Sequence, residues 1–265
     1  MGKILSLFDF EFKRNIRNYL IIILTFCVLL IGKLIMNLNS YNYIMDKIVR
    51  KIKVSELYVN SIGILNFDNL ITNSEVILFL IGILACMLYS IIIWNKDFIG
   101  KNKSIYTLYM LPQNKVNIYI SKFINIICLI YIYVISFVLT LFAAYNIMTP
   151  MMKGNVENFG FVRAIVDKFF IVLPYNFNSF IYNYVVVVTS IVSILFMIIL
   201  FFKYINISKI KHLILSILMV IYLLFIFYKI YLIYISSLQL NIYVCLITTI
   251  LNIFISYKLL YKTDL

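Results

Sequence analysis

The sequence predicts an all-α integral membrane protein with six transmembrane helices, and three observations support this fold class. Hydrophobic residues make up 64% of the 265 residues and charged residues only 12%, and the mean hydropathy is +1.03. The soluble core of a chain this short cannot bury so much apolar surface. Six predominantly apolar runs are each long enough to cross about 30 Å of hydrocarbon. These runs are residues 19–38, 76–94, 120–147, 180–202, 213–234 and 240–260.

The positively charged residues predict which side of the membrane each connection faces. If the N-terminus is cytoplasmic, 14 of the 23 Lys and Arg residues fall in inner segments. They are Lys3, Lys13, Arg14, Arg17, Lys96, Lys101, Lys103, Lys115, Lys122, Lys203, Lys209, Lys211, Lys258 and Lys262. The positive-inside rule therefore predicts a multi-pass protein of the cytoplasmic (cell) membrane with both termini inside. This rule and anionic lipid headgroups account for the net charge of +13, so nucleic acid is not an expected partner.

Two long connections, residues 39–75 and 148–179, are predicted on the extracellular side. In the first, Ile44, Ile48 and Ile52 recur at helical spacing, which suggests a helix on or near the outer surface. Neither connection contains a cysteine pair or a cluster of metal-ligating residues. This composition favours folded caps that shield the ends of the spans over a dedicated ligand site.

Residues 1–18 are predicted to form an amphipathic helix in the plane of the headgroups, ahead of the first span. Its apolar side comprises Leu5, Phe8, Phe12, Ile16 and Tyr19, and its polar side Asp9, Lys13, Arg14 and Arg17. In this arrangement the aromatic rings reach the acyl boundary and the cations contact phosphates. The alternative is that these residues simply begin the first span.

The chain carries no motif for nucleotide hydrolysis or metal chemistry. The chain has three Gly-Lys pairs, and each lacks the earlier glycine and the following Ser or Thr of a phosphate-binding loop. These pairs are Gly2-Lys3, Gly32-Lys33 and Gly100-Lys101. His212 is the only histidine, so the chain has no histidine pair for a zinc protease. We expect no enzyme activity, no bound cofactor and no metal in this chain. The four cysteines lie inside predicted spans as small packing residues: Cys27, Cys86, Cys128 and Cys245.

No Asp or Glu lies in the middle of a predicted span, since Glu75 and Asp97 flank the second run. Proton-coupled transporters usually carry an intramembrane carboxylate, so a self-powered antiporter is disfavoured. Uncharged polar residues cluster on the fourth and sixth spans, where hydrogen bonding between helices is favoured over lining a substrate path. The candidate path-lining residues are Thr189, Ser193, Thr249 and Asn252.

The basic segment between the second and third spans, residues 95–119, is predicted to hold a short cytoplasmic helix. Trp94 precedes it and suits an anchor at the membrane interface. Ser104 is a suitable N-cap, and Pro112 prevents extension of the helix. The residues expected to contact a partner are Ser104, Ile105, Leu108, Tyr109 and Leu111. Such a helix would lie on lipid or dock in the groove of a soluble protein.

These features resemble the permease subunits of type-2 ATP-binding-cassette exporters, including those that export antimicrobial or toxic peptides or confer immunity to them. The resemblance rests on "FDFEFKRNIRNYL" before the first span, then on Asp97, Gly100, Leu111-Pro112 and Lys122 around the second and third spans. It implies that residues 3–18 are the elbow helix and that Ser104 to Leu111 form the coupling helix seated on an ATPase. It also implies two permeases, identical or related, and two ATPase subunits that bind ATP and magnesium.

Membership of this class would make the chain the membrane half of an exporter for an amphipathic or hydrophobic substrate. The short apolar stretch "YKIYLIYISSLQLNIY", between the fifth and sixth spans, favours a peptide over a polysaccharide. The alternative is a self-contained secondary transporter or channel, for which the sequence offers neither ion-coupling residues nor an internal repeat. An intramembrane enzyme would need a catalytic dyad or metal cluster.

Overall fold

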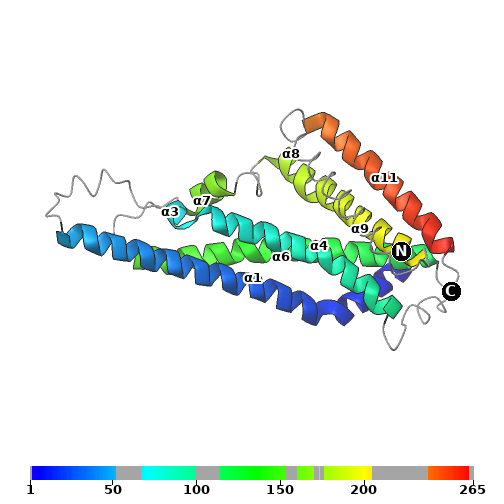
Figure 1. Cartoon of the computed structure of the whole chain (residues 1–265), viewed down its shortest axis with the longest axis horizontal. Helices are drawn as coiled ribbons and strands as arrows, with labels where there is room; N and C mark the ends of the chain where they lie inside the picture. The colour runs from blue at the N-terminus through cyan, green and yellow to red at the C-terminus, as the bar shows by residue number, and fades with distance from the viewer. Residues whose placement is uncertain are drawn as a thin grey trace, which may run out of the picture. The chain divides into compact units, whose positions relative to one another are not determined.

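The computed structural model is all-helical in the residues that it describes, which are 2–51, 67–99, 114–152, 160–169, 173, 176–204 and 238–262 (Figure 1). The long helices are α1 (Gly2–Lys51), α4 (Asn73–Ile99), α6 (Lys115–Met148), α9 (Val188–Tyr204) and α11 (Leu238–Lys262). The short ones are α3 (Phe67–Leu70), the 3-10 helix η1 (Thr149–Met151), α7 (Gly160–Lys168), α8 (Phe177–Phe180) and the π-helix η2 (Ile181–Val187).

Four helical stretches are long and apolar enough to cross a membrane, which indicates a multi-pass membrane protein. They are Ile4–Tyr43, Asn73–Trp94, Lys115–Met151 and Phe177–Phe201. They contain the first three predicted runs and all of the fourth except residue 202. The predicted fifth run, 213–234, lies outside the described residues. The sixth corresponds to α11, in which Cys245–Leu260 form a shorter apolar helix.

The helix boundaries differ from those expected. α1 runs without interruption from Gly2 to Lys51, so no break separates residues 1–18 from the first span, and the helix continues into the predicted connection 39–75. α4 likewise continues past Trp94 to Ile99. The first 111 residues contain no proline, the residue that most strongly ends a helix, so polar residues at the ends of the apolar runs do not stop α1 or α4.

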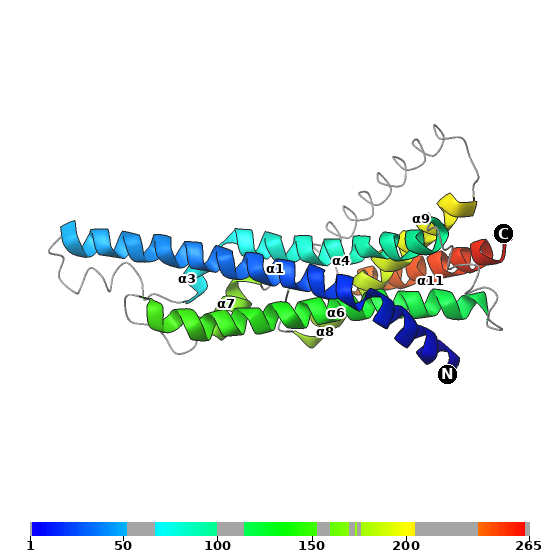
Figure 2. The ribbon, with the colours of Figure 1, turned by 90° about the horizontal axis from the view of Figure 1, so that it is seen from below.

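The chain divides into two compact units, and each is described by itself. Unit 1 comprises residues 1–15, 87–128 and 181–265, and unit 2 comprises residues 16–86 and 129–180. In unit 2, α1, α4 and α6 lie side by side (Figures 1 and 2).

The core of unit 2 is an aromatic cluster around Phe79 of α4. Its ring centroid lies 5.8 Å from that of Tyr133, 4.6 Å from that of Phe137 and 6.3 Å from that of Phe169. Tyr133 also donates a hydrogen bond of 3.3 Å to the backbone carbonyl of Phe79. Gly82, one turn along α4, leaves the space that the Tyr133 ring fills, since a Cβ at that position would lie 2.0 Å from the phenolic oxygen.

A capping box fixes the start of α4 in unit 2. Glu75, fully buried, accepts hydrogen bonds from the backbone N–H of Thr72 at 2.7 Å and from its hydroxyl at 2.6 Å. Asn37 of α1 donates to the same carboxylate at 2.9 Å and to the carbonyl of Leu70 at 2.8 Å. The cap therefore satisfies orphan groups at the helix terminus and ties α1 to α4.

In unit 1, η2 and α9 pack along α11, and the contacts show that the helices run parallel (Figure 1). Val186 packs in one cluster with Cys245, and one turn later the hydroxyl of Ser190 lies 2.7 Å from that of Thr249. Both pairs are 59 residues apart, so the two helices advance in the same direction and in register. A six-span chain requires this direction of its fourth and sixth spans.

Candidate functional site

A buried ion pair joins the start of the chain to the start of α6. The ammonium of Lys122 lies 2.9 Å from Oε1 of Glu11, and the two residues are 111 positions apart in the sequence. The Lys122 side chain is 0% exposed and that of Glu11 is 2% exposed. Burial removes the hydration of both charged groups, which is costly for an unpaired charge. The ion pair compensates for this loss, because each group interacts with the opposite charge instead of with water.

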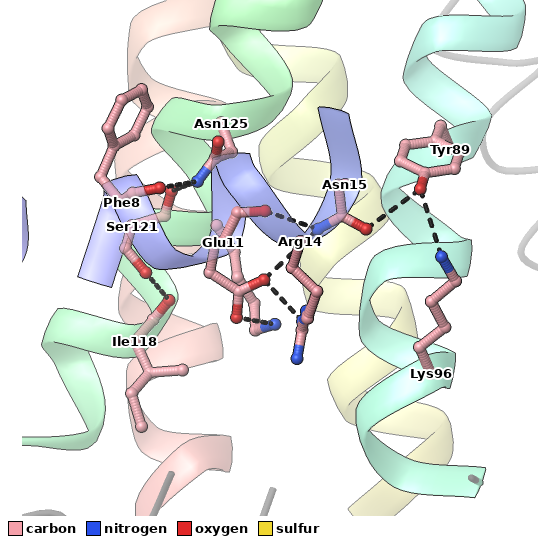
Figure 3. A network of polar contacts seen from close by, with 10 residues as sticks. Phe8, Glu11, Arg14, Asn15, Tyr89, Lys96, Ile118, Ser121 and Asn125 are labelled. Carbon is pink, nitrogen blue, oxygen red and sulfur yellow. Dashed lines mark hydrogen bonds and ion pairs between the residues drawn. The ribbon is translucent and has the colours of Figure 1, made fainter. Parts of the chain in front are cut away.

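The second oxygen of Glu11 extends this pair into a network (Figure 3). Oε2 accepts hydrogen bonds from the Arg14 guanidinium and, at 3.5 Å, from the Asn15 amide. Asn15 in turn accepts a hydrogen bond of 3.1 Å from the hydroxyl of Tyr89 on α4. The ammonium of Lys96, near the end of α4, donates to the Tyr89 hydroxyl at 3.4 Å. The network thus connects the first turns of α1 with both α4 and α6.

A second set of contacts holds the same turns of α1 against α6. The amide of Asn125 donates to the carbonyl of Phe8 at 3.3 Å and to that of Ser121, on its own helix, at 3.0 Å (Figure 3). Leu7 and Ile118 form a small buried apolar contact beside it. The beginning of α1 is therefore attached to α6 by charge, by hydrogen bonds and by packing.

The ammonium of Lys122 also contacts an aromatic ring. It lies 5.3 Å from the ring centroid of Trp94, within the range of a cation–π interaction. The Trp94 ring meets that of Phe196 on α9 edge to face at 5.5 Å, and the Tyr119 ring meets the same phenylalanine at 5.4 Å. Trp94 is 0% exposed, so the expectation that it anchors the protein at the membrane interface is wrong. Its side chain packs inside the protein because Lys122 and Phe196 cover it.

The predicted elbow residues Phe8, Phe12, Lys13, Arg14 and Arg17 all lie in α1. Phe8 and Phe12 stack with ring centroids 5.8 Å apart, and both are half-buried. Lys13 forms an exposed ion pair of 2.7 Å with Asp9. Arg17 is exposed, whereas Arg14 is 26% exposed and paired with Glu11.

The pattern missed the third face of this segment. Leu7, Glu11 and Asn15 recur at intervals of four and are buried. Because two of these three residues are polar, the stripe does not appear in a search for apolar residues at helical spacing. The only available signal was the spacing itself, which places Glu11 one turn after Leu7 and one turn before Asn15.

The predicted coupling residues Ser104, Ile105, Leu108, Tyr109 and Leu111 lie outside the described residues. The structure describes both helices that flank them. α4 ends at Ile99, a few residues after Lys96, and α6 begins at Lys115, two turns before Lys122. The buried network therefore attaches α1 to the last turns of α4 and the first turns of α6, the two helices that flank the predicted coupling residues in the sequence.

The four candidate path-lining residues fall in two groups. Ser193 and Asn252 are buried, with 0% and 5% exposure, and Thr249 contacts α9. Thr189 instead donates to the carbonyl of Val185, 2.6 Å away on its own helix. The sequence pattern included Ser190 but did not single it out, although its hydroxyl makes the direct contact with Thr249.

The arrangement of the network around Glu11 and Lys122 suits mechanical attachment. It holds three helices by charges and amides, and the described residues contain no group of three or more His, Cys, Asp or Glu that could hold a metal ion. Comparisons with family models, with curated proteins and with solved structures gave no match. The site is therefore interpreted from its own geometry.

Proposed function

We propose that this chain is the membrane-spanning subunit of an ATP-driven exporter of the type-2 ATP-binding-cassette class. Separate ATPase subunits would bind ATP and magnesium, and this chain, with a second permease, would move an amphipathic or hydrophobic substrate out of the cell. A toxic or antimicrobial peptide is the substrate class that we propose. The absence of a phosphate-binding loop in the sequence supports a division of labour between this chain and its ATPases.

The observation that carries the proposal is the buried network around Glu11 and Lys122. In such an exporter, the ATPase would push on residues 104–111, and the helices on either side would have to move as one body. The salt bridge and the Asn15–Tyr89 hydrogen bond join both flanking helices to the start of α1. Separating them would leave charges unpaired in an apolar bundle, which favours rigid-body movement over independent sliding.

Copurification tests the proposal directly. The tagged chain is extracted from its native membrane in mild detergent, and bound proteins are identified and assayed for ATP hydrolysis. We expect a stoichiometric ATPase, and we expect the double variant Leu108→Asp with Tyr109→Asp to lose it while still inserting in the membrane. A chain that is stable and free of any ATPase would overturn the proposal.

A matched control separates loss of docking from general damage. Val162 and Phe177, in the predicted extracellular connection, are 60% and 75% exposed. The double variant Val162→Asp with Phe177→Asp introduces the same two charges away from the predicted docking helix. It should retain the ATPase, because these side chains would lie on the opposite side of the membrane.

One observation favours a second candidate, a self-contained secondary transporter. Glu11 is a buried carboxylate in a helix that continues into an apolar span, and intramembrane carboxylates often carry protons or ions. A transporter of this kind would lose ion-coupled uptake or efflux in the variant Glu11→Gln without needing a partner. Transport by the purified chain alone in liposomes, driven by an ion gradient, would favour this candidate over the exporter.

A further inference from the structure

A second polar feature of unit 1 involves α9 and α11. Three polar side chains of α11 recur at intervals of three and four, and α9 contributes two serines to the same interface. This set is the polar track, and it comprises Thr249, Asn252 and Ser256 of α11 with Ser190 and Ser193 of α9. All except Thr249 are at least nine-tenths buried.

The parallel register places these side chains in successive layers. Ser190 and Thr249 are in contact, and each helix advances by three residues to reach Ser193 and Asn252. Ser256 lies one turn further along α11. Cys245, one turn before Thr249, adds its backbone carbonyl, which accepts from Ser190 at 3.1 Å and from Thr249 at 2.6 Å. From Cys245 to Ser256 the helix rises about 16 Å, roughly half of the hydrocarbon thickness.

Two residues of the track, Asn252 and Ser256, carry a polar group that has no hydrogen-bond partner among the described residues. The amide nitrogen of Asn252 is buried without an acceptor, and the hydroxyls of Ser256 and Tyr119 are buried without a hydrogen-bond partner. On α4, the fully buried hydroxyl of Ser90 is also unpartnered. Unpaired polar groups are costly where neither lipid nor apolar side chains can bond them, and buried water is the usual partner for such groups.

We propose that the polar track binds a file of water molecules that reaches along α11 from Ser256 to Cys245. The water molecules bond the free amide of Asn252 and the hydroxyls of Ser256 and Tyr119. The opposite face of α11, which includes Ile250 at 66% exposure and Phe254 at 54%, is apolar and suits lipid. Water therefore follows one face of this helix and lipid covers the other. This inference stands whether or not an ATPase drives the protein.

The native cysteines provide the test without any substitution. Thiols react as thiolates, which form only where water reaches them, so a charged methanethiosulfonate reagent reports hydration. Native membranes are treated with the reagent for increasing times, and mass spectrometry follows each cysteine. We expect Cys245, which is 5% exposed, to react at least tenfold faster than Cys86, which is 0% exposed and off the track. Equal rates for these two buried thiols would overturn the proposal.

A pair of variants then tests whether the track carries the water. Asn252→Leu replaces the unpaired amide by an apolar group and should slow labelling of Cys245 at least tenfold. Ile253→Leu, at a neighbouring apolar position that is 39% exposed, should leave the rate unchanged. An unchanged rate in Asn252→Leu would show that water reaches Cys245 by another route and would contradict the proposed file. The experiment needs no ATPase, so its failure is distinct from failure of the exporter proposal.

Discussion

The ammonium of Lys122 lies 2.9 Å from the carboxylate of Glu11, and neither side chain is more than 2% exposed. Two opposite charges thus meet inside a bundle whose surroundings are apolar. Such a pair is a weak source of net stability but a strong constraint on packing, because removing one partner leaves the other without compensation.

Substitution of Lys122 by methionine should destabilise the protein by about 3 kcal/mol, the lower end of the cost of breaking a buried pair, because Arg14 remains beside Glu11. The double variant Glu11→Leu with Lys122→Met should recover part of this loss, since it removes the uncompensated charge. Thermal unfolding in detergent measures both variants. A double variant less stable than Lys122→Met alone would contradict the explanation.

The control for this prediction is the exposed ion pair of the same helix. Lys13 and Asp9 are 2.7 Å apart, but their side chains are 73% and 59% exposed. Because solvent screens exposed pairs, Lys13→Met should leave the unfolding temperature unchanged within error. An equal loss in both lysine variants would show that burial is not the cause.

The single tryptophan should report on the interior of unit 1. Trp94 is the only Trp in the chain and is 0% exposed, so its fluorescence needs no deconvolution. We expect blue-shifted emission and quenching by acrylamide that is several-fold weaker than that of free indole. Lys122→Met should change the emission intensity, because the ammonium lies over the ring at 5.3 Å. Quenching as efficient as that of an exposed indole would place Trp94 at the surface.

Gly82→Ala should destabilise the protein by about 1–3 kcal/mol, the usual cost of overpacking. The added Cβ would lie 2.0 Å from the hydroxyl oxygen and 2.3 Å from Cζ of Tyr133, so the ring must leave its place in the aromatic cluster. Gly32→Ala is the matched control, because a Cβ there would meet nothing within 4 Å. It should be neutral or slightly stabilising, since alanine favours the helix. Equal effects of the two variants on the unfolding temperature would refute the steric explanation.

Glu75→Gln should cost about 1.5–3 kcal/mol, the range for a hydrogen bond to a charged group. The amide replaces one of the two carboxylate oxygens by a donor. That donor then faces either the amide of Asn37, which donates to Oε1, or the backbone N–H of Thr72, which donates to Oε2. Hydrogen exchange of the first turn of α4, together with thermal unfolding, measures the loss of the cap. Asn73→Ala, at the exposed next position, is the control and should have little effect.

The apolar runs made the helical class and most of the long helices predictable. Their length and hydropathy depend only on local composition, so four of the six predicted spans correspond to described helices that are long and apolar enough to cross a membrane. The ends of the helices were less predictable. α1 and α4 continue beyond their apolar runs because backbone hydrogen bonding persists until a breaker intervenes, whatever the polarity of the side chains.

The candidate site was predictable only in its outline. The segment 95–119 and the amphipathic start of the chain drew attention to the right part of the sequence, but no pattern singled out Glu11. Lys122 was noted only as an inner basic residue and as part of the resemblance around the second and third spans. Trp94 was assigned to the membrane interface because tryptophan is common there, and nothing nearby in sequence indicated that Phe196 would cover it.

The sequence by itself determined that this chain forms long apolar helices, that basic residues concentrate on one predicted side, and that phosphate-binding and metal-binding motifs are missing. Each of these is a property of composition or of neighbours within a few residues. The tertiary structure alone decided that Lys122 pairs with Glu11 and that Trp94 is buried. It also decided the register of α9 and α11, in which contacting residues such as Ser190 and Thr249 are 59 positions apart in the sequence. These contacts join residues far apart in the chain, and they depend on how helix surfaces fit together, which no local pattern of residues specifies.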